Sequence, residues 1–179
     1  MRGLAALLLS GLVLILPAAC GDDRGGEAPE PRPEGAVAEL GGIDYTVDLA
    51  RQLNTSIPPD SDYFQGPGAP PGSLYFGVFL HACNRGGAPR SSAERLTLVD
   101  AFGNRLKPKE LPDDNVFAYE ARDLAPGECI PREGSAAARA APGAMLLFEV
   151  PHDVFRNRPL KLRIQAPSRK ESVSLQLGV

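Results

Sequence analysis

The chain has 179 residues and a net charge of −3, from 22 acidic and 19 basic side chains. Residues 41–179 carry as many bases as acids, which argues against nucleic-acid binding because that function needs a basic domain. The 19 glycines and 18 prolines exclude a domain built of long helices.

The N-terminal residues are typical of an exported protein. Arg2 supplies a positive charge, residues 4–16 form a short apolar run, and two alanines precede Cys20. This order looks like the lipobox of bacterial lipoproteins, with Pro17 where that motif usually has leucine. The resemblance implies a signal peptide at 1–19, a lipid on Cys20, and a chain held on the extracytoplasmic face of the cell membrane.

Two alternatives to lipidation stay open. One is an ordinary secretory signal in which Cys20 is incidental. The other is a retained membrane anchor, for which the apolar run is short. In either lipid-anchored or secreted form, we expect an oxidising compartment around the mature chain.

Residues 20–40 are predicted to form the lipidated cysteine and a disordered acidic tether. The segment is rich in Gly, Pro, Glu and Asp and has almost no large apolar residue before its end. Such a segment cannot bury enough surface to offset the entropy lost on ordering. Its negative charge also makes it unsuited to lie on an anionic membrane.

Short apolar or alternating runs, separated by turn residues, follow in residues 41–179. Strict alternation in the last two runs indicates strands with one face in the core. Residues 100–104 are predicted to form a hairpin turn, and residues 135–141 a short helix capped by Ser135. Strands are expected at 45–47, 49–54, 73–84, 96–99, 105–106, 116–119, 144–150, 160–165 and 173–177.

The strongest of these runs is 73–84, in which residues of both parities are largely apolar. Both faces of such a strand should be covered, so we expect it in the centre of a sheet. The loop that carries Cys129 is a candidate for part of that cover. About seven to nine short strands without a long helix predict an all-β antiparallel sandwich over residues 41–179.

The chain resembles a family of immunoglobulin-like domains of unknown function, found in bacterial lipoproteins and secreted antigens. The resemblance covers about residues 43–179 and implies an immunoglobulin-like β-sandwich with no shared catalytic residues. It is carried by a long strand that ends in Asn, a Leu-x-Asp-x-x-Gly hairpin, a turn, and a strand that ends in Val-Pro. These features lie at 74–84, 98–103, 124–127 and 147–151.

Cysteine number predicts a disulfide. If a lipid takes Cys20, the remaining pair is Cys83 and Cys129, and an even number in an oxidising compartment favours one bridge. Two unpaired thiols are the alternative. A copper site that combines His81 and Cys83 with other soft ligands is a weaker interpretation, because the ligands are not clustered in one loop.

The chain shows no motif for catalysis, and we expect neither an enzyme nor a bound cofactor or metal. No serine stands in Gly-x-Ser-x-Gly, no histidine follows a nucleophile–base pattern, and no glycine loop suits a phosphate. The acidic clusters at 60–62 and 113–115 lack the spacing of a calcium loop. They suit turns, where Asp and Asn bond their own backbone.

Two functions remain open. The first is a non-enzymatic module, tethered to the membrane through lipid on Cys20, that binds an envelope protein or another ligand but no nucleic acid. Its candidate contact surface is loop 57–72, which carries Tyr63 and Phe64, since aromatic side chains are favoured at interfaces. The alternative for these two rings is that they close one end of the sandwich. The second function is a carrier or sensor of a small ligand or metal ion, which would need a pocket.

Overall fold

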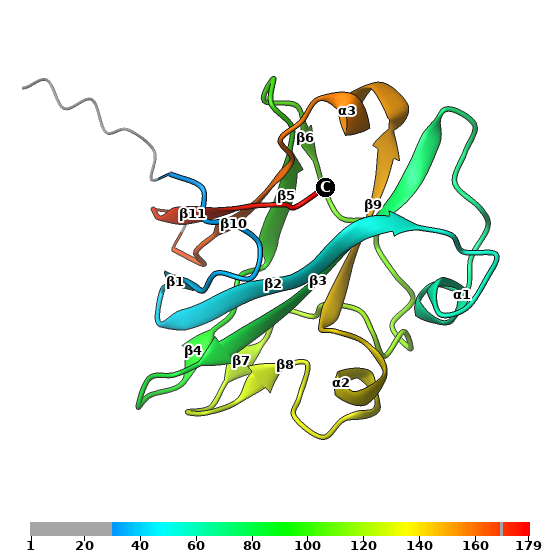
Figure 1. Cartoon of the computed structure of the whole chain (residues 1–179). Helices are drawn as coiled ribbons and strands as arrows, with labels where there is room; N and C mark the ends of the chain where they lie inside the picture. Colours follow the sequence, from blue (N-terminus) through cyan, green and yellow to red (C-terminus); the bar gives the residue numbers. More distant parts are fainter. Residues whose placement is uncertain (1–29, 169) are drawn as a thin grey trace, which may run out of the picture.

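The computed structural model describes residues 30–168 and 170–179 (Figure 1). The predicted signal peptide and the predicted lipidation site, Cys20, lie outside the described residues. Over the described part the fold is an antiparallel β-sandwich of a five-stranded and a four-stranded sheet, as predicted, with one further pair of two-residue strands.

The first sheet has the order β1-β2-β3-β8, and β9 also pairs with β3. The second sheet has the order β11-β10-β5-β6, and β4 pairs with β7. The strands are β1 (Ala38–Leu40), β2 (Ile43–Leu53), β3 (Ser73–Asn84), β4 (Arg90–Ser91), β5 (Arg95–Val99), β6 (Arg105–Leu106), β7 (Asp123–Leu124), β8 (Cys129–Ile130), β9 (Ala144–Pro151), β10 (Lys161–Gln165) and β11 (Ser172–Gln176). The short helices are α1 (Asp60–Tyr63), α2 (Ala136–Ala140) and α3 (His152–Arg156).

Strand β3 lies in the middle of the first sheet, as its two apolar faces predict. It pairs with β2 along one side, and with β9 and then β8 along the other. Phe76 and Leu80 point into the core between the sheets, whereas Tyr75 and Phe79 point to the outer face and are also buried. The loop that carries Cys129 is not part of the cover, because β8 extends the sheet beside β3 instead of lying over it.

The core between the sheets follows the period-two pattern of the strands. Leu96 and Leu98 of β5 and Leu162 and Ile164 of β10 are at most 3% exposed, and they pack against Phe76 and its neighbours in β3 and β9. The alternate residues of β5 and β10 point away from the core. Burying the apolar side of each strand therefore fixes which residues form the outer face of the second sheet.

The hairpin between β5 and β6 forms where it was predicted. The carboxylate of Asp100 accepts hydrogen bonds from the backbone N–H groups of Phe102 and Asn104 at 3.0 and 2.8 Å. Gly103 adopts a φ of +86°, which suits a residue without a Cβ atom. The short helix after Ser135 is also confirmed, and the Ser135 hydroxyl accepts from Ala138 N at 3.1 Å.

The strand predicted at 116–119 is wrong. Met145 N donates to Phe117 O and Tyr119 N donates to Met145 O, so this segment touches the edge of β9 through a single bridge at Ala118. A turn closed by Asn115, whose side chain accepts from Phe117 N, starts the segment and stops it from becoming a longer strand.

The prediction of a disordered tether as far as residue 40 is wrong for its last part. Arg32 N donates to Ser174 O and Gln176 N donates to Arg32 O, which ties the chain to the edge of β11. Further on, β1 pairs with β2, and Ala38 and Leu40 are buried. The segment is acidic, but one of its acids has a structural role, since Glu34 accepts hydrogen bonds from Ala50 N and Gly178 N.

Candidate functional site

Cys83 and Cys129 form the predicted disulfide. They stand directly opposite each other in the pairing of β3 with β8, with Cα atoms 4.1 Å apart. The alternative of two unpaired thiols is wrong, and Cys83 is not available to a metal site with His81. The bridge closes a loop of 46 residue steps between the centre of the first sheet and its last short strand.

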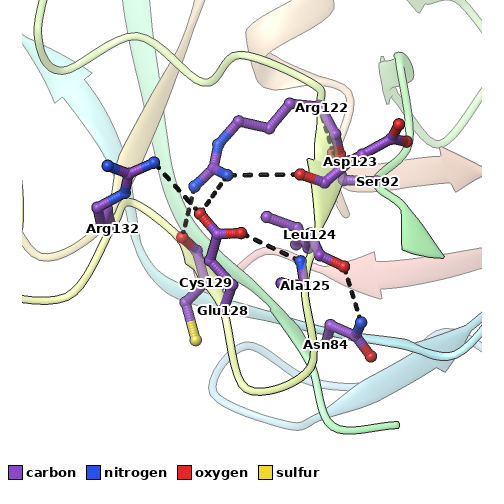
Figure 2. Close-up of polar contacts among 9 residues, drawn as sticks. All are labelled: Asn84, Ser92, Arg122, Asp123, Leu124, Ala125, Glu128, Cys129 and Arg132. Atoms are coloured by element: carbon purple, nitrogen blue, oxygen red, sulfur yellow. Dashed lines mark hydrogen bonds and ion pairs between the residues drawn. The ribbon is translucent and has the colours of Figure 1, made fainter. Parts of the chain in front are cut away.

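Polar contacts surround this end of the sheet (Figure 2). Arg122 donates to the Glu128 carboxylate at 2.5 Å and to the Cys129 carbonyl at 3.0 Å, and Ala125 N donates to Glu128 at 3.1 Å. The bond from Ala125 and the Arg122 guanidinium lower the pKa of Glu128. Buried Asn84 of β3 donates to Leu124 O of β7. These hydrogen bonds therefore fix the segment 122–129 against the end of β3.

Tyr63 and Phe64 are not the contact residues that were predicted for loop 57–72, because they are buried at 7% and 5% exposure. Tyr63 packs edge-on against Phe79 and Phe117, and Phe64 packs edge-on against Tyr75. The alternative is right that the rings pack within the domain, but they lie on the outer face of the first sheet and do not close one end of the sandwich. The larger side chains that cover part of the outer face of the first sheet are what we call the apolar lid: Tyr63, Phe64, Leu111 and Phe117.

The residues weighed for metal binding have other roles. His81 Nδ1 lies 2.6 Å from a carboxylate oxygen of Asp48, at the bulge in β2. Asp60 receives hydrogen bonds from Arg51 and from Asn54 N. Among the described residues, no three His, Cys, Asp or Glu side chains lie close enough together to hold a metal ion.

A groove of about 1010 Å³ lies on one flank of the sandwich, and we call it the flank groove. It forms where the chain between β6 and β7 crosses from the second sheet to the first and bonds to the edge of β9, with Lys109 N donating to Leu147 O. Its apolar floor includes Met145 and Leu147, and charged side chains such as Arg105 and Glu120 stand at its rim. A volume near 1000 Å³ is at the upper end of small-molecule sites.

One wall of the flank groove is an open strand edge. Strand β6 pairs with β5 only at Leu98 and Val99, so Arg95–Thr97 have a strand partner, β10, on one side only. Asp100 N donates to Asn104 O on the β6 side, and backbone groups alternate in direction along a strand. The N–H and C=O of Leu96 therefore point toward the flank groove.

Tyr119, which lines the flank groove, and Asp100, in the turn between β5 and β6, have pKa values that are shifted away from neutrality. Burial, reinforced by the neighbouring Tyr45, raises the pKa of Tyr119 far above its usual range, and the Tyr119 hydroxyl donates to Ala93 O at 2.9 Å. Burial raises the pKa of Asp100, but hydrogen bonds from Asn157 and Asn104 outweigh it and lower that pKa overall. A general acid or base works best with a pKa near the operating pH.

Sequence reasoning did not find the flank groove. Many of its residues come from the stretch 107–121, in which the sequence predicted only a strand at 116–119 that does not form. The signal present there is a pair of prolines, Pro108 and Pro112, which mark a segment that cannot pair fully with a neighbouring strand. The partner of this segment, β9, is far along the chain, and no local pattern identifies it.

No protein-family model and no curated protein matches the sequence. Solved structures with a similar fold exist. A conserved hypothetical protein from Bacillus anthracis matches with a TM-score of 0.52 and 13% identity over 80% of this chain and 94% of its own. The yjhA protein from Bacillus subtilis matches with a TM-score of 0.55 and 11% identity over 82% of this chain and 99% of its own.

A third structure, an uncharacterized β-sandwich protein from Clostridium difficile, matches with a TM-score of 0.44 and 11% identity over 84% of this chain and 96% of its own. At these identities the likeness is one of fold alone. The resemblance stated from the sequence therefore holds at the level of a β-sandwich of unknown function that also occurs in bacterial proteins. In the described part of the chain, no helix has the length and apolar character needed to cross a membrane.

Proposed function

We propose that this chain is a lipid-anchored protein of the extracytoplasmic face of the cell membrane, and that its sandwich binds a partner in the flank groove without catalysis. The observation that carries the binding role is the open edge of β5 along that groove. An extended segment of a partner protein can add to this edge through the N–H and C=O of Leu96.

The chemistry of the described residues supports a non-enzymatic role. Six described side chains have pKa values shifted away from neutrality: those of Tyr45, Tyr119 and Arg51 are raised, and those of the carboxylates Asp60, Asp100 and Glu128 are lowered. Catalytic acids and bases are usually shifted toward neutrality instead. The charged side chains around the flank groove, such as Arg105 and Glu120, can orient a ligand through ion pairs and hydrogen bonds.

The binding role is tested by placing a photocrosslinking amino acid at Thr97, which lines the flank groove. We expect one main adduct with an envelope protein, and we expect Ala121→Trp, which fills the groove, to abolish it. The control position is Thr46, on the outer face of the first sheet. Equal adducts from both positions, or adducts unaffected by Ala121→Trp, would contradict a site in the flank groove.

Anchoring is tested separately with Cys20→Ser in living cells. We expect the variant to be released to the medium or to stay unprocessed, because the thiol that receives the lipid is gone. Normal processing and normal membrane retention of this variant would contradict lipidation. A small-ligand carrier remains the second candidate, and the volume of the flank groove favours it over a metal carrier.

A further inference from the structure

The strands of the second sheet carry four cations and no acidic residue. Their sequences are Arg-Leu-Thr-Leu-Val, Arg-Leu, Lys-Leu-Arg-Ile-Gln and Ser-Val-Ser-Leu-Gln. In the first sheet the balance is reversed, since β1, β2 and β9 hold four acids and one arginine. A domain that is neutral as a whole therefore separates its charges between its two sheets.

All four cations point to the same side. Because Leu96, Leu98, Leu162 and Ile164 face the core, the alternate residues of β5 and β10 face outward. These outward residues include the cations, and together we call them the cationic face: Arg95, Arg105, Lys161 and Arg163.

Strand register places these cations in neighbouring rows. Lys161 lies opposite Val99, which lies opposite Arg105 on its other side, so the two cations are separated by one strand. With strands about 4.8 Å apart, their backbones are about 10 Å from each other. Arg163 is in the next row, opposite Thr97 and Ser174.

The cationic face is open and its charges are not neutralised within the domain. Arg95 and Arg105 are exposed, and Lys161 and Arg163 are half-exposed. Within residues 30–168 and 170–179, none of the four has a carboxylate within ion-pair distance. Arg163 donates to the Ser172 hydroxyl at 3.2 Å, which leaves its charge available.

The chain enters the fold at the edge of this face. Arg32 bonds to Ser174 and Gln176 of β11, the edge strand of the second sheet (Figure 1). Cys20 stands only twelve positions earlier in the sequence. Twelve residues span at most about 43 Å even when fully extended. A lipid on Cys20 would thus keep this edge of the second sheet within about 43 Å of the membrane.

We propose that the cationic face docks the domain against a membrane surface that carries anionic phosphate headgroups. The charge of the face carries the proposal, and its position beside the tether rests on the lipid anchoring proposed above. Each cation near such a surface strengthens binding about fivefold. Exposed Phe102, at the tip of the hairpin that bears Arg105, adds an aromatic ring at the border of the face.

The test uses residues 20–179 with Cys20→Ser, so that no lipid contributes, and co-sedimentation with phosphatidylcholine vesicles that contain or lack phosphatidylglycerol. We expect binding only to the anionic vesicles, weakening as salt is raised. The pair Lys161→Gln and Arg163→Gln should lower the partition coefficient about 25-fold, fivefold for each cation. Neither residue contributes to the floor of the flank groove.

The matched control is the pair Arg132→Gln and Arg139→Gln, which changes net charge equally but lies in and before α2, away from the second sheet. Binding of this pair should stay within about twofold of the parent chain. Absent vesicle binding, or an equal loss for both pairs, would overturn the proposal.

Two further outcomes would replace the proposed occupant. Binding to a single-stranded oligonucleotide but not to anionic vesicles would make the face a nucleic-acid site. Vesicle binding that appears only after Asp22→Asn, Asp23→Asn and Glu27→Gln would make the chain's own acidic segment the occupant. Because the assay contains no attached lipid, its failure is distinct from a failure of anchoring, which the Cys20→Ser experiment in cells detects.

Discussion

Around Tyr75 and Phe79, the outer face of the first sheet lies under the apolar lid, whereas the outer face of the second sheet is open and cationic. Tyr75 and Phe79 of β3 are buried against the lid, while the corresponding outward positions of β10 are Lys161 and Arg163. Both sheets share one core, so the difference between the outer faces is not needed to form the sandwich. It shows that the chain covers part of one outer face with its own apolar side chains and leaves the cations of the other outer face accessible.

We expect the largest difference between the two sheets when one outward side chain is removed from each and the free energies of unfolding are compared. Phe79→Ala empties a fully buried site under the apolar lid and should lower the free energy of unfolding by about 3–5 kcal/mol. Val99→Ala, on the half-exposed outer face of the second sheet, should cost about 1 kcal/mol or less. Denaturant unfolding measures both, and similar losses would contradict the comparison.

The disulfide adds a covalent constraint to the first sheet. Replacing Cys83 and Cys129 by serine removes a bridge across 46 residues, for which the chain-entropy estimate is about 4 kcal/mol. We expect the double variant to unfold at a lower denaturant concentration, and the parent chain treated with a reductant to match it. If reduction left the unfolding midpoint unchanged, the bridge would not contribute to stability.

Sequence alone was sufficient where the information is local. The alternation at 161–165 predicted the strand and its core face, two apolar faces predicted the central place of β3, and Ser135 predicted the cap of α2. The cysteine pair was predicted by counting. In these cases the residues that decide the structure are neighbours in the sequence or, for the cysteines, the pair that remains when Cys20 is set aside for the lipid.

Prediction failed where the deciding contact is distant in sequence. Pro and Gly at 57–72 indicated a loop, but only the packing of Tyr63 on Phe117 shows that the loop folds back onto the sheet. The segment near Arg32 has a disordered composition, yet two backbone hydrogen bonds to β11 hold it in place. The flank groove depends on the contact of residues 109–119 with β9, which no local pattern encodes.

Two carboxylates are buried, Asp100 in the turn between β5 and β6 and Asp60 in α1, and we expect both to make the stability of the fold depend on pH. The folded pKa of Asp100 lies below its ordinary value of 3.8, so its stabilising contribution is complete above that pH and is lost as pH falls through the lower folded pKa. Asp100→Asn should cost about 2 kcal/mol at neutral pH through weakened charged hydrogen bonds. The difference between variant and parent should shrink below pH 3.8, as measured by thermal unfolding.

A control for this pH effect is the Arg51–Asp60 ion pair beside the apolar lid. Burial opposes ionisation of Asp60, but the bond from Arg51 outweighs it and lowers the Asp60 pKa. Asp60→Asn should therefore lose its cost over the same acidic range. A variant of either residue that stayed equally destabilised at acidic pH would show that shape, and not charge, accounts for the loss.

The smallest effect on stability, and the most informative about the open face, is expected from Phe102→Ala. Phe102 is 80% exposed at the tip of the β5–β6 hairpin, so the free energy of unfolding should change by no more than about 0.5 kcal/mol. The Asp100 carboxylate that caps this turn bonds to the backbone N–H of Phe102, which alanine retains.

If the cationic face meets a membrane, the exposed ring of Phe102 enters the headgroup boundary, and its loss should weaken vesicle binding roughly threefold. Exposed Val116, which lies outside the second sheet, is the matched position, and Val116→Ala should leave vesicle binding unchanged. Equal binding of the two variants would restrict the contact to the cations, whereas a loss of stability in Phe102→Ala would show that the ring packs within the domain.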